Sequence, residues 1–147
     1  MGVTEKIGDP NSQGALALDP IALLKALRPL QWVKNGLVFL PFVFAVDLAW
    51  STDDLGPVPE LLLKLVFVAL AFCALSSAIY LFNDLMDRSG DRLHPVKKNR
   101  PIASGKVGVP VAVAVMIMLA TAGLVAMVLV EPFLGLAGGL YAGINVG

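Results

Sequence analysis

The amino-acid sequence predicts an all-α protein, a multi-pass bundle of transmembrane helices. Of its 147 residues, 57% are hydrophobic and only 15% are charged, and the mean hydropathy is +0.80. A soluble domain of this size cannot bury so much apolar surface in its core. The charged residues also gather between long apolar runs, as they do when polar loops join spanning helices. The formal net charge of zero gives no indication of a nucleic-acid partner.

The N-terminal residues are polar and lack the apolar central region of a secretory signal peptide. We interpret residues 1–19 as a disordered cytoplasmic tail. Asp19 and Pro20 then predict a helix start, an N-cap followed by proline in the first turn. Residues 21–27 carry three leucines with the basic Lys25, and Arg28 follows, which favours a short helix lying on the membrane surface, and Pro29 ends or bends it.

Four apolar runs follow, and residues 20–147 are expected to form the N-terminal part of a transmembrane domain. The first run, residues 33–50, is short, so Lys34 must reach back to the membrane surface, and Pro41 is expected to kink the helix. The next two runs are long enough to cross a bilayer. The last three runs are residues 61–82, 107–130 and 133–147.

The basic residues predict which side of the membrane each loop occupies. Lysine and arginine precede the first span and recur between the second and third, whereas the link between the first two spans is acidic. By the positive-inside rule, the N-terminus and the loop of residues 83–106 are cytoplasmic. The expected location is the plasma (inner) membrane.

The loop of residues 83–106 opens with acidic side chains. If the second span continues as a helix, spacings of three and four place Asp84, Asp87 and Asp91 on one face. Carboxylates that close repel one another, and Mg²⁺ removes the conflict because it prefers a few carboxylates together with substrate phosphates. Asn83 can add a neutral oxygen ligand or a hydrogen bond to the substrate.

The surroundings of these aspartates favour a binding site over a solvated helix end in which Asp84 pairs with Arg88. The carboxylates adjoin a spanning helix, where charge is costly and usually functional. Three basic residues follow, Lys97, Lys98 and Arg100. An acidic metal site facing a basic cluster suits a diphosphate bound with Mg²⁺, although contact with anionic lipid would also explain the cluster.

Several other polar residues have a structural interpretation. His94 precedes Pro95 and is expected to serve a turn rather than catalysis. Trp32 is expected to anchor the chain at the membrane interface. Lys34 lies at the depth of the aspartates, so it either snorkels to the headgroups or contacts substrate phosphates. The residues expected to mediate helix packing or local hydrogen bonds are Ser76, Ser77, Gly138, Gly139 and Gly143.

Taken together, these motifs resemble the UbiA prenyltransferase superfamily. Its first aspartate-rich motif is similar to the pattern Asn83-Asp84-x-x-Asp87-x-x-x-Asp91, then Lys97, then Arg100-Pro101-Ile102-x-Ser104-Gly105. A second stretch resembles the decaprenyl-phosphate phosphoribosyltransferase branch of that superfamily. It reads Arg28-Pro29-Leu30-Gln31-Trp32-Val33-Lys34-Asn35, with His94-Pro95 in the loop.

The resemblance implies an intramembrane, Mg²⁺-dependent enzyme of about nine spanning helices, of which about four would be present here. It implies transfer of a phosphoribosyl group from phosphoribosyl diphosphate to a polyprenyl phosphate, in the synthesis of a cell-wall arabinan precursor. The family's second aspartate-rich motif would lie on a later loop, so the chain alone is expected to be inactive. The implied metal-binding and catalytic residues are Asp84, Asp87 and Asp91. The implied phosphate-binding residues are Lys34, Asn83, Lys97 and Arg100.

Three alternatives stay open. A prenyltransferase of the same superfamily would move a prenyl chain from a prenyl diphosphate to an aromatic acceptor. The sugar donor carries an extra phosphate and needs more cations, which favours the phosphoribosyl reaction. A CDP-alcohol phosphotransferase is disfavoured because its Asp-Gly and Ala-Arg elements are missing where Ser77-Ala78-Ile79-Tyr80 stands. The third alternative is an inactive four-span membrane protein or fragment.

Overall fold

The computed structural model describes residues 16–146, in which the regular elements are all helices and no strand occurs. The all-α prediction is therefore confirmed for this part of the chain. Helices α4 and α6 are each long and apolar enough to cross a membrane. The elements are α2 (Pro20–Ala26), η1 (Pro29–Phe39), α3 (Leu40–Phe44), α4 (Val58–Met86), α5 (Arg88–Leu93), η2 (Lys97–Asn99), α6 (Val109–Val130) and α7 (Pro132–Asn145).

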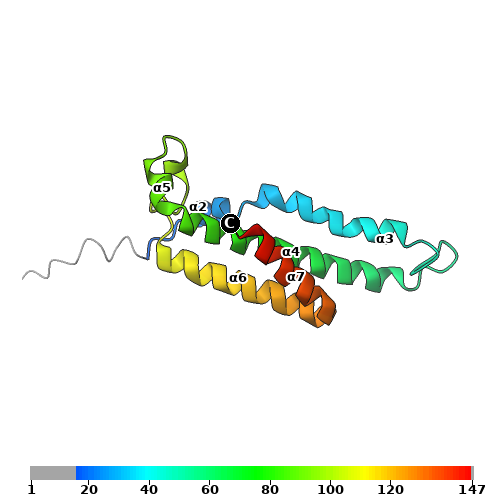
Figure 1. The fold of residues 1–147 in the computed structure, drawn as a ribbon. Helices are drawn as coiled ribbons and strands as arrows, with labels where there is room; N and C mark the ends of the chain where they lie inside the picture. The colour runs from blue at the N-terminus through cyan, green and yellow to red at the C-terminus, as the bar shows by residue number, and fades with distance from the viewer. Residues whose placement is uncertain (1–15, 147) are drawn as a thin grey trace, which may run out of the picture.

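Helix α4 is the centre of the bundle, with η1 and α3 along one side and α6 along the other (Figure 1). Helix α7 folds back against both α6 and α4. The short elements α2 and α5 lie at one end of α4, and the turn between α3 and α4 lies at the other. The end that carries α2 and α5 is therefore where segments distant in sequence meet.

Buried side chains form two clusters along α4. One cluster joins α2 to α4, α6 and the segment before α6, and it includes Ala26, Leu81 and Ile102. The other joins α4 to α6 and α7 through Ala71, Leu75 and Met127. Small residues in α2 let that short helix lie directly on α4, which holds the chain that follows it close to the end of α4.

Glycines account for part of the close packing between helices. A Cβ on Gly123 would lie 2.8 Å from Leu75 Cδ1, and one on Gly138 would collide with Met127 Sδ. A Cβ on Gly139 or Gly143 would meet nothing within 4 Å among the described residues. The close-packing prediction is confirmed for Gly138 and wrong for Gly139 and Gly143.

The first apolar run is not one kinked α-helix. Residues 29–39 form a 3₁₀-helix, and Pro41 stands in the first turn of α3, where proline is tolerated because its missing N–H has no helical partner. A 3₁₀-helix of 11 residues is unusually long. With three residues per turn, Trp32 and Asn35 share one face, and both side chains hydrogen-bond to α4. These contacts favour the tighter helix.

The segment before α2 is ordered where it is described. Asp19 caps α2 by accepting from the backbone N–H groups of Ile21 and Ala22 at 3.0 and 3.1 Å, so the predicted N-cap is confirmed. The backbone N–H of Asp19 also donates to the carbonyl of Lys106 at 3.1 Å. Residues 16–19 therefore differ from the predicted disordered tail, whose remaining part, residues 1–15, lies outside the described residues.

Candidate functional site

Two buried carboxylates lie at the end of the bundle that carries α2 and α5. Asp84 is in the last turn of α4 and Asp91 is in α5, and each is 3% exposed. The backbone N–H of Asp91 donates to the carbonyl of Asp87 at 2.8 Å, so helical hydrogen bonding continues across the join. Residues seven apart return to nearly the same face of a helix, whereas Asp87, at the junction of α4 and α5, is exposed.

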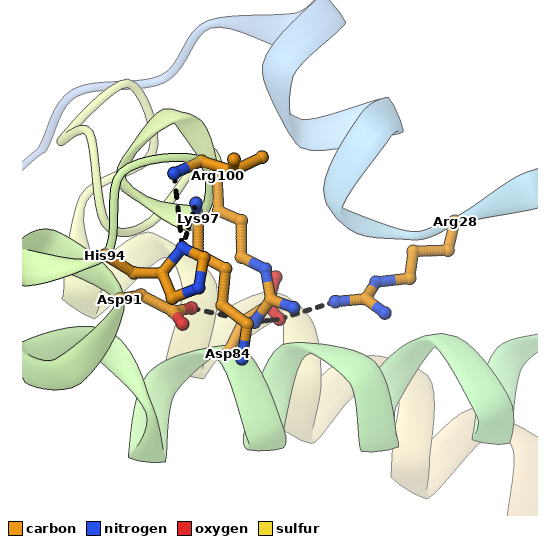
Figure 2. A network of polar contacts seen from close by, with 7 residues as sticks. Arg28, Asp84, Asp91, His94, Lys97 and Arg100 are labelled. Carbon is orange, nitrogen blue, oxygen red and sulfur yellow. Dashed lines mark hydrogen bonds and ion pairs between the residues drawn. The ribbon is translucent and has the colours of Figure 1, made fainter.

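Two arginines bind these carboxylates. Arg100 Nη1 donates to Asp91 Oδ2 at 2.7 Å and to Asp84 Oδ1 at 3.3 Å, and Arg28 Nη2 donates to Asp84 Oδ1 at 2.7 Å. Figure 2 shows the two guanidinium groups approaching Asp84 from different segments. Such pairing offsets the cost of burying carboxylates away from water. The four side chains form a network with no net charge, which we call the arginine–aspartate network.

Arg28 reaches this network from an unusual backbone conformation. It lies between α2 and η1 with φ 52° and ψ 57°, in the left-handed region that a non-glycine residue seldom adopts. Pro29 follows it and disfavours a continuation of α2 through this residue. The guanidinium also lies 4.7 Å from the centre of the Tyr80 ring, a cation–π contact. The turn therefore aims Arg28 at the end of α4.

The loop after α5 fixes Arg100 in place. His94 Nδ1 accepts hydrogen bonds from the backbone N–H groups of Val96 and Lys97, both at 3.2 Å. The predicted role of His94 in a turn is thereby confirmed. Arg92 Nε donates to the carbonyl of Ala103 at 3.1 Å, and the adjacent Ile102 is fully buried. These contacts hold both ends of the segment that carries Arg100.

A second set of polar contacts anchors η1 to α4 beneath the network. Trp32 Nε1 donates to Ser77 Oγ, which donates to the carbonyl of Leu27, each at 3.0 Å. Asn35 Nδ2 lies 3.5 Å from Ser76 Oγ. The packing role predicted for the two serines is confirmed. Trp32 is more than an interfacial anchor, because its indole N–H is bound inside the bundle.

The structure brings together only some of the residues predicted to form the site. Asp84, Asp91 and Arg100 share the arginine–aspartate network, and Arg28 is the member that the sequence treated only as a basic flank. The sequence feature that could have identified Arg28 is its position as a basic residue directly before a proline at the end of a helix. Four predicted residues lie outside the network: Asp87, Lys34 and Lys97 are exposed, and Asn83 Nδ2 donates to the carbonyl of Asn145 at 3.4 Å.

Two sequence interpretations of this region change. The solvated helix end with an Asp84–Arg88 pair is wrong, because Asp84 is buried and pairs with Arg28 and Arg100. Asp87 is exposed, so of the three predicted carboxylates only Asp84 and Asp91 are buried in the network. Helix α4 continues to Met86, so Asn83 and Asp84 belong to a helix and not to the loop. Asp84 is therefore held rigidly at the end of α4.

The network suits a phosphate ligand that arrives with its metal ion. Among residues 16–146, no group of three His, Cys, Asp or Glu side chains is arranged to hold a metal by itself. Mg²⁺ usually takes one or two carboxylates and completes its coordination with substrate phosphates and water. Asp84 and Asp91, joined through Arg100, fit that smaller requirement. Arginine guanidinium groups in turn match the geometry of phosphate oxygens.

Comparisons with known proteins identify one family and several relatives. The sequence profile of the UbiA prenyltransferase family matches residues 38–146. The chain is 40% identical over 103 residues to the decaprenyl-phosphate phosphoribosyltransferase of Mycolicibacterium smegmatis, covering 70% of this chain and 31% of that protein. It is 37% identical over 114 residues to the protein of the same name from Mycobacterium tuberculosis, covering 78% and 36%.

A further relative carries a different name. The chain is 41% identical over 97 residues to nodulation protein NoeC of Azorhizobium caulinodans, covering 66% of this chain and 29% of that protein. The chain therefore spans about a third of the length of the curated relatives it matches.

Proposed function

The chain belongs to the UbiA prenyltransferase family, and from that premise we propose that its site serves Mg²⁺-dependent transfer of a phosphoribosyl group from phosphoribosyl diphosphate to a polyprenyl phosphate. The observation that carries the proposal is the arginine–aspartate network at the end of α4. It combines two buried carboxylates with two guanidinium groups, the side chains that a Mg²⁺-bound diphosphate requires. The names of the mycobacterial relatives support the choice of substrates.

The reaction is a substitution at the anomeric carbon of the ribose. An oxygen of the polyprenyl phosphate forms a bond to that carbon while the bond to the diphosphate oxygen breaks, and diphosphate leaves with the electron pair. The acceptor is already an anion, so no strong general base is required. Mg²⁺, when bound, neutralises negative charge on the leaving group.

The side chains of the site bind and orient the substrates. Asp84 and Asp91 would hold Mg²⁺, and Arg28 and Arg100 would bind phosphate oxygens and stabilise the charge that develops on them. Asn83, Lys34, Lys97 and Asp87 stay proposed as further contacts. We also propose that the site faces the cytoplasm from the plasma membrane and that the product is a precursor of cell-wall arabinan.

Binding selectivity tests the proposal on the chain itself. We expect the purified chain to bind phosphoribosyl diphosphate with Mg²⁺ more tightly than an isoprenyl diphosphate with Mg²⁺, because the extra phosphate of the sugar contacts cations. Isothermal titration in detergent measures both, and Asp84→Asn is expected to weaken binding only when Mg²⁺ is present. Tighter binding of the isoprenyl diphosphate would favour the alternative, prenyl transfer to an aromatic acceptor.

Turnover is tested by a chimera. This chain replaces the aligned segment of the Mycobacterium tuberculosis relative, and release of diphosphate is measured with phosphoribosyl diphosphate and decaprenyl phosphate. We expect turnover that is lost with Asp84→Asn and kept with Lys64→Gln, since Lys64 pairs with Glu60 at the far end of α4. A stable chimera without turnover would contradict the proposal.

A further inference from the structure

An apolar groove with cations along it adjoins the arginine–aspartate network. Its volume is about 380 Å³, and α2 and the start of η1 form its walls. Ile21, Leu24 and Leu30 supply large apolar surface and are 68%, 53% and 87% exposed. Lys25, Arg28 and Gln31 supply the polar groups. We call this the α2–η1 groove.

The sequence of α2 explains why the groove is apolar yet carries charge. Spacings of three and four place Ile21, Leu24 and Lys25 on one side of the helix, and Arg28 follows in the turn after it. The other side carries small residues, including Ala26, which are buried against the bundle. Helix α2 therefore packs through its alanines and Leu23 and turns Ile21, Leu24 and Lys25 outward.

Arg28 belongs to both the groove and the catalytic site. It lines the groove, and its Nη2 atom lies 2.7 Å from Asp84 Oδ1. The left-handed turn at Arg28 also places the start of η1 beside α2, so that Leu30 and Gln31 complete the second wall. A phosphate bound by Arg28 in the groove would therefore lie beside the proposed diphosphate site.

We propose that the α2–η1 groove binds the acceptor substrate, a polyprenyl monophosphate. The phosphate contacts Lys25, Arg28 and Gln31, and the first isoprene units lie against Ile21, Leu24 and Leu30. This inference rests on the proposed function, because the transfer needs the acceptor oxygen next to the ribose carbon.

Charge complementarity selects this occupant. A soluble sugar phosphate would leave the leucines of the groove without a partner, and an uncharged polyprenol would leave the cations without one. A molecule with an anionic head and an apolar tail satisfies both. A second apolar pocket, lined by Arg88, Leu85 and Val109, lies between α4 and α6. It shares no residue with the arginine–aspartate network, so it is the competing location that the experiment must distinguish.

Photoaffinity labelling of the chain in detergent micelles tests the groove. The probe is a photoactivatable polyprenyl monophosphate, and the labelled peptide is located by mass spectrometry. We expect labelling within residues 20–31, competed by polyprenyl monophosphate and at least about tenfold less well by polyprenol or phosphatidylglycerol. Labelling near Arg88, or equal competition by polyprenol or by phosphatidylglycerol, would overturn the inference.

Matched substitutions separate the groove from general membrane attraction. Lys25→Gln is expected to weaken competition by polyprenyl monophosphate about tenfold, since one charge-assisted contact is lost. Lys64→Gln makes the same chemical change in another exposed lysine, at the far end of α4, and is expected to have no effect. An equal effect of both changes would contradict a specific phosphate contact.

The outcome also distinguishes this inference from the proposed function. Labelling of the groove together with an inactive but stable chimera would contradict the phosphoribosyl transfer and leave the lipid-phosphate site in place. Turnover by the chimera together with labelling elsewhere would contradict the groove and leave the transfer in place.

Discussion

Removing Arg100 should destabilise the protein more than removing Arg28. Arg100 is the only described cationic partner of Asp91, which is 3% exposed, whereas Asp84 is bound by both arginines. Arg100→Gln therefore leaves a buried carboxylate without its counter-charge. Arg28→Gln leaves Asp84 with Arg100.

The expected magnitudes follow from burial. Breaking a buried ion pair by removing one partner costs about 3–5 kcal/mol, and because Arg100 is itself 28% exposed we expect the lower end, about 3 kcal/mol. Arg28→Gln removes one charge-assisted hydrogen bond and one cation–π contact, for which we expect about 2 kcal/mol. Asp91→Asn combined with Arg100→Gln should restore much of the loss, because the unpaired charge is gone.

The single cysteine provides the assay. Cys73 lies on α4 and is partly buried, so a fluorogenic maleimide reports its exposure during titration with SDS in mixed micelles. The midpoints of the two single variants and of the double variant rank their free energies of unfolding. The reasoning would be refuted if Arg28→Gln cost as much as Arg100→Gln, or if the double variant were no more stable than Arg100→Gln.

Three further predictions concern packing, the loop and topology. Gly123→Ala should destabilise the contact of α6 with α4 by about 1–3 kcal/mol, because its Cβ would press on Leu75 and on the carbonyl of Ala71. Gly139→Ala should be neutral or stabilising, and the SDS titration compares the stabilities of the two variants. His94→Ala should speed hydrogen exchange at the backbone amides of Val96 and Lys97, whereas His94→Asn keeps a side-chain acceptor and should preserve their protection. Equal exchange rates in both variants would contradict the assigned hydrogen bonds. In a Cys73→Ala background, a membrane-impermeant maleimide should label Thr52→Cys in intact cells and Ser89→Cys only after permeabilisation, and the reverse pattern would invert the proposed orientation.

Local signals predicted the regular parts of the fold. The N-cap at Asp19 and the long apolar runs of α4 and α6 each depend on neighbouring residues in the sequence, and the structure contains all of them. The 3₁₀-helix from Pro29 to Phe39 could not be predicted from neighbouring residues alone. Its conformation depends on hydroxyl groups of α4, more than forty residues further along the chain, and a local pattern carries no information about such partners.

The same limit explains the result at the site. Spacing placed Asp84 and Asp91 on one face, and Arg100 was predicted as a cation that faces them, because all three lie within one short stretch. Spacing alone could not show that Asp87 is exposed outside the network, since the exposure of a position depends on the tertiary partners around it.

Arg28 was missed as a site residue because its partner Asp84 is 56 residues away. The left-handed turn that aims its side chain arises from a tertiary arrangement, the docking of α2 on α4 through small buried residues. A left-handed conformation in a non-glycine residue costs on the order of 1–3 kcal/mol and persists only where the surroundings enforce it. Here the ion pair with Asp84 and the contact with Tyr80 provide that enforcement. The strain at Arg28 is visible only in the folded chain, and this one side chain would link the proposed acceptor groove to the proposed phosphate site.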